Sequence, residues 1–438
     1  MPRTAARRYR HFEPANSSTP KLSKSSSAEP HASAEPPHLP ANYAPHLPTE
    51  ILLHILSFIP PRRTSQTTLA SFCLVSRAWY AAAITRLYEK PSIHGKNFDP
   101  FVRTVCPSIN AHVRKSELAE LVKVLDLSSL VHHGSKSVTA RLLGRTKANL
   151  HTFVAPQASF GLNCLAALSK CQQLRVLDLG LISESIGLQD LIHALAKLGT
   201  LTTLAFPRCS LSRSGFYPRS ISWPPRLASL TLSGGVDNEI VYRMATLDGC
   251  KLPPSLTKLS LTHCTAVMAS TALELIRSLR DQLVTLHITD MPRFGVGDMN
   301  TVLYDLPKLL HLTVSLDYLD CGAFRITPVS ALEVPRIYPL QSLRLVLSGN
   351  PAPPEYECSP ADLEININRG FFPFLHDVSV AKSCGWNKGS HADELLGLAE
   401  VVEEQDAKNR KARRGLYASL SDEEVARIPP GGVWEIEG

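Results

Sequence analysis

Only a few residues in this chain have the types and spacings that chemistry would use. The imidazoles of His132-His133 are potential metal ligands, and the carboxylates of Asp237 and Glu239 are a potential acid/base pair. Gly295-Val296-Gly297 begins like a phosphate-binding glycine loop, but it lacks the third glycine and the strand-to-helix context of such loops. We interpret the histidines as part of a loop, the carboxylates as isolated surface acids and the glycines as a turn.

A wider motif search also argues against an active site. The chain contains no His-Glu-x-x-His, no phosphate-binding loop and no Gly-x-Ser-x-Gly. Its ten cysteines run from Cys73 to Cys384 without a Cys-x-x-C spacing, which is typical of reduced thiols in the cytoplasm or nucleus rather than of a zinc ribbon or a redox pair. We therefore expect a protein that is not an enzyme, with no catalytic residue, no metal and no cofactor.

Composition and charge narrow the class of protein further. The chain has 438 residues, 44% of them hydrophobic and 19% charged, which suits two or three domains or one elongated repeat array. No run approaches the roughly 18 to 20 apolar residues of a membrane span, so we expect no membrane partner. The net charge of +7 is spread as +3 in residues 1–44, +9 in 45–392 and −5 in 393–438. Such a diffuse excess argues against a nucleic-acid partner.

The elements that must position a binding surface begin after residue 44. Residues 1–44 hold seven Pro and seven Ser and few large apolar groups, which predicts a disordered arm. Between residues 46 and 90 apolar residues recur at helical spacing instead. The first series is Leu47, Ile51, Leu52, Ile55, Leu56 and Ile59, and the second is Leu69, Phe72, Cys73, Val75, Trp79, Ala83, Leu87 and Tyr88. Pro48 suits the first turn of a helix, and Pro60-Pro61 ends that helix.

These residues resemble the F-box family. The opening of the family pattern is matched by Leu47-Pro48-x-Glu50-Ile51-Leu52-x-x-Ile55-Leu56-x-Phe58-Ile59, a later element by Leu74-Val75-Ser76-Arg77-x-Trp79, and the closing pair by Leu87-Tyr88. The middle departs from the pattern, because Arg62-Arg63-Thr64-Ser65 replaces the usual Asp-Leu. The resemblance implies docking onto the Skp-type adaptor of an SCF ubiquitin ligase and, through it, onto a cullin. The residues leave one alternative open, an amphipathic helical cap with no adaptor partner.

Docking of this kind requires apolar side chains that stay exposed on the free protein. We expect a helix-in-groove interface with the adaptor. The candidate adaptor-binding residues are Leu47, Pro48, Ile51, Leu52, Ile55, Leu56, Val75, Trp79 and Tyr88. Some of them must form the core of the helical unit, and the sequence does not divide the two groups.

A second pattern, the frame Leu-x-x-Leu-x-Leu, repeats beyond residue 118. Ten copies start at residues 122, 150, 174, 201, 227, 256, 283, 309, 340 and 375. Their mean interval of about 28 residues is that of leucine-rich repeats. Alternating apolar residues predict one short strand per copy, so we expect an α/β fold in which an all-α unit precedes a leucine-rich-repeat solenoid, with a parallel β ladder and helices or loops on its convex side. We interpret Cys171, Cys209 and Cys264 as buried structural cysteines.

Residues between the apolar positions of each frame should face the concave side of the ladder. Most are Ser and Thr, and the later copies add the candidate substrate-binding residues Lys258, His287, His311 and Arg344. Arg beside hydroxyl groups suits carboxylate or phosphate, so an acidic or phosphorylated peptide would fit. The same polar side chains would also serve solubility alone.

The predicted organisation combines these patterns. Residues 1–44 form the disordered arm, 45–92 the F-box, 93–117 a connecting segment, 118–386 the solenoid, and 387–438 a helical C-terminal tail or cap with a capping box at Ser421-x-x-Glu424. The chain resembles F-box proteins with leucine-rich repeats. This resemblance implies a substrate receptor that links a ubiquitin ligase to a target protein, whose identity the sequence does not give. The alternative is a leucine-rich-repeat scaffold or sensor that acts without a ubiquitin ligase.

Overall fold

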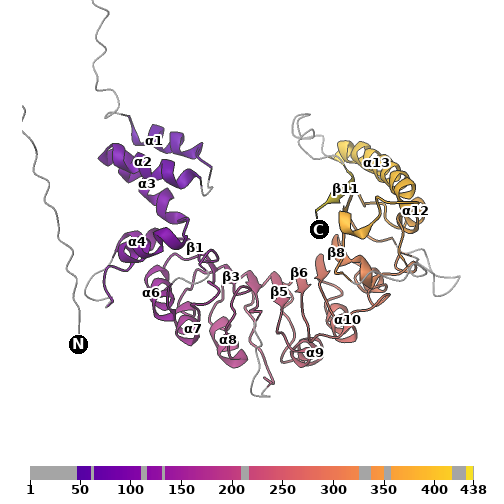
Figure 1. Cartoon of the computed structure of the whole chain (residues 1–438), viewed down its shortest axis with the longest axis horizontal. Helices are drawn as coiled ribbons and strands as arrows, with labels where there is room; N and C mark the ends of the chain where they lie inside the picture. The colour runs from indigo at the N-terminus through magenta and orange to yellow at the C-terminus, as the bar shows by residue number, and fades with distance from the viewer. Residues whose placement is uncertain are drawn as a thin grey trace, which may run out of the picture. The chain divides into compact units, whose positions relative to one another are not determined.

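A computed structural model describes residues 47–60, 64–109, 116–130, 134–208, 217–324, 337–349, 357–416 and 431–437. The predicted arm at 1–44, His132-His133, Cys209 and the predicted capping box at 421–424 lie outside these residues. The described residues comprise a helical unit and a long parallel sheet with helices along one side, which confirms the predicted fold class (Figure 1).

Three helices form the unit that the first apolar pattern predicts: α1 (Thr49–Ser57), α2 (Ser65–Val75) and α3 (Arg77–Glu89). Ser76 caps α3 by accepting a hydrogen bond from the Trp79 amide at 3.3 Å. The buried core of the unit consists of Leu52, Leu56, Leu69, Trp79, Ala82 and Ala83. Phe72 stacks on Trp79 with 4.6 Å between ring centroids, so α2 is packed onto α3 even though its start departs from the F-box pattern.

The predicted connecting segment at 93–117 contains a further helix, α4 (Gly95–Val105), and is followed by α5 (Leu118–Leu121). The apolar residues of α4 recur at helical spacing. They are Phe98, Phe101, Val102 and Val105, and all four are buried in the same core as the repeats. The segment therefore contributes to the solenoid rather than only leading to it.

The sheet contains eleven parallel strands in strict chain order. They are β1 (Val124–Asp126), β2 (Thr152–Val154), β3 (Val176–Asp178), β4 (Thr203–Ala205), β5 (Ser229–Ser233), β6 (Lys258–Thr262), β7 (Thr285–Thr289), β8 (His311–Ser315), β9 (Ser342–Val346), β10 (Asp377–Ala381) and β11 (Gly432–Ile436). The first ten coincide with the ten predicted frames. In each frame the central apolar residue lies on the strand and is buried in the core between the strands and the helices.

Helices or short turns return the chain from one strand to the next. The described helices are α6 (Lys136–Thr146), α7 (Leu162–Leu168), α8 (Leu188–Leu195), α9 (Asn238–Thr246), α10 (Ala269–Ser278), α11 (Val302–Asp305), α12 (Pro360–Asn368) and α13 (His391–Leu416). The helices α6 to α10 line the outer side of the strand ladder, and the strands form its inner side (Figure 1). One continuous cluster of buried apolar side chains fills the space between them.

The eleventh strand corrects the expectation that residues 387–438 are helical. The helix α13 is present, but β11 then pairs with β10 in parallel, with Trp434 opposite Ser379. Tertiary contacts hold this arrangement: the Gln405 side-chain amide on α13 donates to the Phe372 and Leu375 carbonyls at 2.8 and 2.6 Å, and Asp406 accepts from the Gly431 amide at 2.9 Å. The strand escaped the frame search because it follows β10 after nearly two repeat intervals and lacks the full Leu-x-x-Leu-x-Leu pattern.

Two of the three cysteines interpreted as structural, Cys171 and Cys264, lie in the described residues and are buried. Cys264 is buried and donates its thiol to the Leu232 carbonyl at 3.4 Å, and Cys171 donates to the Ala167 carbonyl at 3.7 Å. Burial raises the pKa of Cys264 to about 11 and that of Cys171 to about 12, so both remain protonated at neutral pH and are poor nucleophiles.

After three successive strands the backbone enters the left-handed region. Gly234 follows β5 with φ 63°, His263 follows β6 with φ 55°, and Asp290 follows β7 with φ 53°. The left-handed turn is therefore a feature of these repeats, because it occurs whether the residue is glycine, histidine or aspartate. At Gly234 a Cβ atom would also overlap the backbone of Arg208, so glycine is needed there.

Candidate protein-binding surfaces

The helix α1 has one buried face and one exposed apolar face. Leu52 and Leu56 are 1% and 0% exposed, whereas Ile51, Ile55 and Phe58 are 45%, 37% and 74% exposed. The exposed three lie at i, i+4 and i+7, so they form one stripe along the helix and its end, which we call the α1 stripe. An apolar stripe of this kind is a surface that a protein partner could cover.

The structure divides the nine candidate adaptor-binding residues into two groups. Leu47, Pro48, Ile51, Ile55 and Val75 are exposed. Leu52, Leu56 and Trp79 instead form the core of the three-helix unit, and half-buried Tyr88 packs against the repeat core, stacked on Phe101 with 6.4 Å between ring centroids. These four side chains pack within the chain, so they hold the exposed residues in place and offer little surface to a partner.

Four exposed apolar side chains of the helical unit were not among the candidates. Leu53, Phe58, Leu74 and Tyr80 are 49%, 74%, 87% and 45% exposed. A signal existed for Phe58, since it is seven residues after Ile51 and therefore on the same side of α1. For Leu74 and Tyr80 the sequence carried no such signal, because which face of α2 or α3 is buried depends on how the helices pack.

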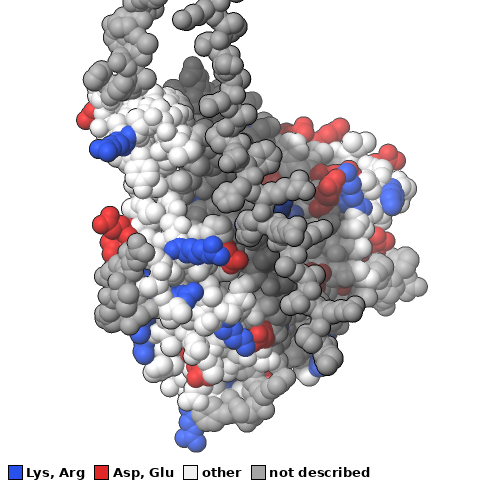
Figure 2. All heavy atoms as spheres, turned by 60° about the vertical axis from the view of Figure 1, so that its left-hand side comes forward, with Lys and Arg blue, Asp and Glu red and all other residues white. Residues whose placement is uncertain are grey.

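The helical unit also carries few charged groups. In the three helices these are Glu50, Arg77, Arg86 and Glu89. Arg86 donates to the Leu56 carbonyl, and Glu89 pairs with Lys123 at 2.9 Å, so two of the four are engaged within the chain. Figure 2, which turns this end of the molecule forward, shows mainly uncharged atoms there. The surface is suited to an apolar contact.

The second candidate surface is the inner face of the strands. Lys258, His287, His311 and Arg344 lie on four consecutive strands, β6 to β9, and all project from the same face because strand side chains alternate. The register separates them into two rows. Lys258 and His311 share the first-position row, whereas His287 and Arg344 share the third-position row.

Spacing within each row follows from the sheet. Both pairs are two strands apart, which places their Cα atoms about 10 Å from each other. Lys258, His311 and Arg344 are exposed, and His287 is half-buried. The four residues therefore form an extended cationic area and not a compact cluster, and no single small ligand would contact all of them.

His287 is held mainly in its neutral form. Its Nε2 lies 3.1 Å from the Thr289 hydroxyl. Burial lowers the pKa of this imidazole below its ordinary value of 6.5, and the positive charges of Arg344 and Lys258 lower it further, while Asp290 opposes them. At neutral pH the positive charge of the area therefore resides on Lys258 and Arg344, and His287 offers hydrogen bonding.

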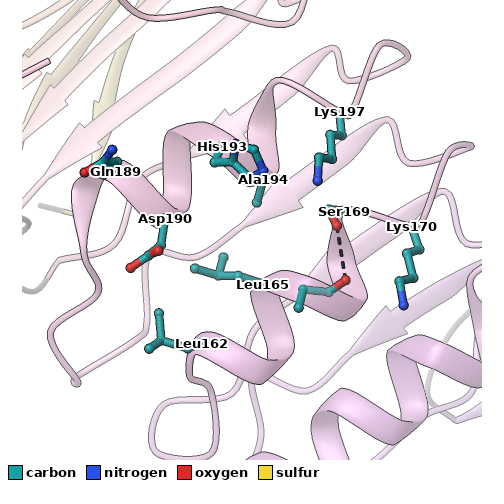
Figure 3. A pocket seen from close by; sticks show the side chains of 10 residues that line it. Leu162, Leu165, Ser169, Lys170, Gln189, Asp190, His193, Ala194 and Lys197 are labelled. Carbon is teal, nitrogen blue, oxygen red and sulfur yellow. Dashed lines mark hydrogen bonds between the residues drawn. The ribbon is translucent and has the colours of Figure 1, made fainter.

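A groove of about 550 Å³ opens between α7 and α8 on the helix side of the solenoid (Figure 3). Leu162 and Leu165 line its apolar side, and Lys170 and Lys197 follow the C-terminal ends of the two helices. The positive charges of both lysines lie near the C-terminal ends of the helices, where the helix dipole is negative. The negative charge of Asp190 lies in the first turn of α8, where the helix dipole is positive. The charges of this groove thus have structural explanations, and we do not assign it a function.

Within the described ranges, no three or more His, Cys, Asp and Glu side chains are grouped so that they could hold a metal ion. No helix in the described part of the chain is both long and apolar enough to cross a bilayer.

Comparisons with known proteins identify the helical unit. A model of the F-box-like family matches residues 44–94. The F-box protein YDR306C of Saccharomyces cerevisiae is 34% identical over 347 residues, which cover 79% of this chain and 69% of the yeast protein. The protein pof5 of Schizosaccharomyces pombe is 24% identical over 367 residues, covering 83% of this chain and 97% of pof5.

Solved structures show more distant similarity. A TLR13–ssRNA13 complex matches 60% of this chain and 33% of its own chain, with 20% identity and a TM-score of 0.36. A chain of the yeast Rad7–Elc1 complex matches over 76% of this chain and 72% of its own, with 13% identity and a TM-score of 0.31.

Proposed function

Since this chain belongs to the F-box protein family, we propose that it is the substrate-recognition subunit of an SCF-type ubiquitin ligase. In this proposal the three-helix unit binds the Skp-type adaptor and, through it, a cullin, and the inner face of the repeats binds a target protein. The observation that carries the proposal is the α1 stripe, an exposed apolar surface within the segment that the F-box-like model matches.

The stripe supports adaptor binding on physical grounds. The exposed parts of Ile51, Ile55 and Phe58 contribute little to the stability of the free chain, but each would contribute to binding if a partner groove covered it. Leu52 and Leu56 on the opposite side are already packed, so the helix can present the stripe without losing its own core. Among the described residues of α1 to α3 only four are Asp, Glu, Lys or Arg, so few charges there would have to be desolvated by a contact.

Target binding is assigned to the inner strand face with Lys258, His287, His311 and Arg344 as contact residues. Lys258, His311 and Arg344 are exposed on this face, and the strand ladder holds their backbones in a regular spacing. A rigid ladder limits the entropy that is lost when a target binds.

No side chain of this protein needs to perform chemistry in such a role. Binding the ligase and the target on one chain raises the effective concentration of target lysines near the activated ubiquitin. The protein would act as a non-catalytic subunit in the cytoplasm or nucleus.

A pull-down with purified Skp-type adaptor tests the proposal. The wild-type chain should retain the adaptor, and the variant Leu47→Ala with Pro48→Ala should retain less of it, because both residues are exposed at the start of α1. A wild-type chain that does not retain the adaptor would exclude the ligase role. The remaining function would then be that of a leucine-rich-repeat scaffold or sensor, which is our second candidate.

A further inference from the structure

The last strand adds an exposed aromatic residue to the inner face of the ladder. The chain has four tryptophans, and Trp79, Trp223 and Trp386 are 8%, 9% and 1% exposed. Trp434, at the third position of β11, is 46% exposed. A half-exposed indole offers a large apolar surface together with an N–H donor, a combination common at the centres of protein interfaces.

Trp434 lies in register with one of the cationic side chains. Arg344 on β9 pairs with Ser379 on β10, and Ser379 pairs with Trp434 on β11. The three side chains therefore project from the same face in one row, and the Cα atoms of Arg344 and Trp434 are about 10 Å apart. The side chain between them in this row is that of Ser379, which is small and polar.

The indole is folded back over its own strand. A Cβ atom added at Gly432 would lie 3.3 Å from Cζ2 of Trp434, so the ring lies over this glycine on the inner face. Glycine at this position leaves room for the ring to lie flat there. The indole therefore lies along the inner face of β11, with nearly half of its surface still exposed.

Charge on this face favours an acidic ligand next to the indole. At the inner-face positions of β6 to β11 the cations are Lys258, Arg344 and the titratable His287 and His311, and Asp377 is the acid. Asp377 accepts a hydrogen bond from the Ser342 hydroxyl at 2.9 Å, and this bond satisfies part of its acceptor capacity. Cations thus outnumber acids at these positions, and Arg344 is the exposed cation that shares a row with Trp434.

We propose that Arg344 and Trp434 form a two-part recognition site for an extended segment of the target protein. The segment carries an acidic side chain that pairs with Arg344 and, two residues away, a large apolar side chain that covers Trp434. In an extended chain, side chains two residues apart project to the same side and are about 7 Å from each other, and the long arginine side chain can span the difference from the distance of about 10 Å between the two Cα atoms. This inference rests on the proposed target-binding role of the inner face and specifies the class of target.

A protein segment fits this site better than a single-stranded nucleic acid does. An indole beside an arginine could also stack on a base next to a phosphate. However, a nucleic acid brings one phosphate per nucleotide, and Asp377 on the same face would repel an additional phosphate beside Arg344. A peptide with one acidic residue meets Arg344 without that cost.

The fluorescence of Trp434 provides the test. The probe is a short tryptophan-free peptide with an Asp-Ser-Leu core in Gly-Ser flanks, added to the full chain while quenching by neutral acrylamide is measured. The variant Trp434→Phe, whose remaining tryptophans are all buried, defines the baseline without the exposed indole. We expect the peptide to reduce the quenching of the wild-type chain toward that baseline, and the Arg344→Gln variant to require more peptide for the same protection.

Matched probes decide between the possible outcomes. A peptide with an Asn-Ser-Leu core should protect less than the Asp-Ser-Leu peptide. The proposal is overturned if the two peptides protect equally, if neither protects at millimolar concentration, or if an oligothymidylate protects more than the acidic peptide. The Arg344→Gln and Trp434→Phe variants should bind the Skp-type adaptor like the wild type, so failure of adaptor binding in the wild type would refute the ligase role without deciding the peptide result.

Discussion

The α1 stripe permits a quantitative prediction for adaptor binding. We expect that replacing Ile51, Ile55 and Phe58 together by alanine removes most of the apolar surface that this helix offers. Burying a whole side chain of this size contributes about 1.5–3 kcal/mol, and the three are 45%, 37% and 74% exposed, so the part still available to a partner contributes about 3 kcal/mol in total. Since 1.4 kcal/mol corresponds to a tenfold change, the Kd for the adaptor should rise by about 100-fold.

Titration of purified Skp-type adaptor into the full chain in a calorimeter measures this change, and thermal unfolding of the same samples monitors the fold. Leu53 is the matched control, because it is 49% exposed on a different face of α1. Leu53→Ala should change the Kd by less than about twofold, as expected for a surface substitution outside the interface. All variants should remain folded, because none of these side chains belongs to the buried core of the three helices, although the triple variant should unfold at a lower temperature because Ile51 and Ile55 are partly buried.

Two results would refute the reasoning. If the triple variant remains folded and binds the adaptor with a Kd within threefold of the wild type, the stripe is not the interface. If Leu53→Ala weakens binding as much as the triple variant does, the contact is not specific to the face that the stripe defines.

Three further predictions concern stability and pH. Leu52→Ala should destabilise the helical unit by about 2–5 kcal/mol because Leu52 is buried, which hydrogen exchange in α1 to α3 would detect as lost protection; unchanged protection would contradict the assigned core. Gly234→Ala should cost more than about 1–2 kcal/mol in chemical denaturation because of its positive φ and the overlap with the Arg208 backbone, whereas His263→Gly at the equivalent turn should cost far less. The lowered pKa of His287 means that the unfolded chain binds a proton more readily, so folding stability should decrease as pH falls below 6.5, and His287→Gln should remove this part of the pH dependence. An acidic peptide bound nearby would raise that pKa, so peptide affinity should increase over the same pH range, and a pH-independent affinity would place the peptide elsewhere.

Local patterns in the sequence determined the architecture. The frames that contain Leu177, Leu230 and Leu286 each predicted a strand. In a strand every second side chain projects from the same face, so apolar residues at every second position can all be buried in the core. The same holds for α1, where the spacing of apolar residues required a helix. Its F-box motif then indicated the family.

Tertiary packing decided which side chains are left on the surface. The sequence alone did not separate Leu52 from Ile51, since both are apolar neighbours on one helix, and only the position of α2 and α3 buries the first and exposes the second. Likewise, Trp434 belongs to the inner face only because α13 brings Gly432–Ile436 against β10 after a long excursion of the chain. Periodicity specifies local conformation, but burial and pairing between distant segments depend on contacts that no local pattern contains.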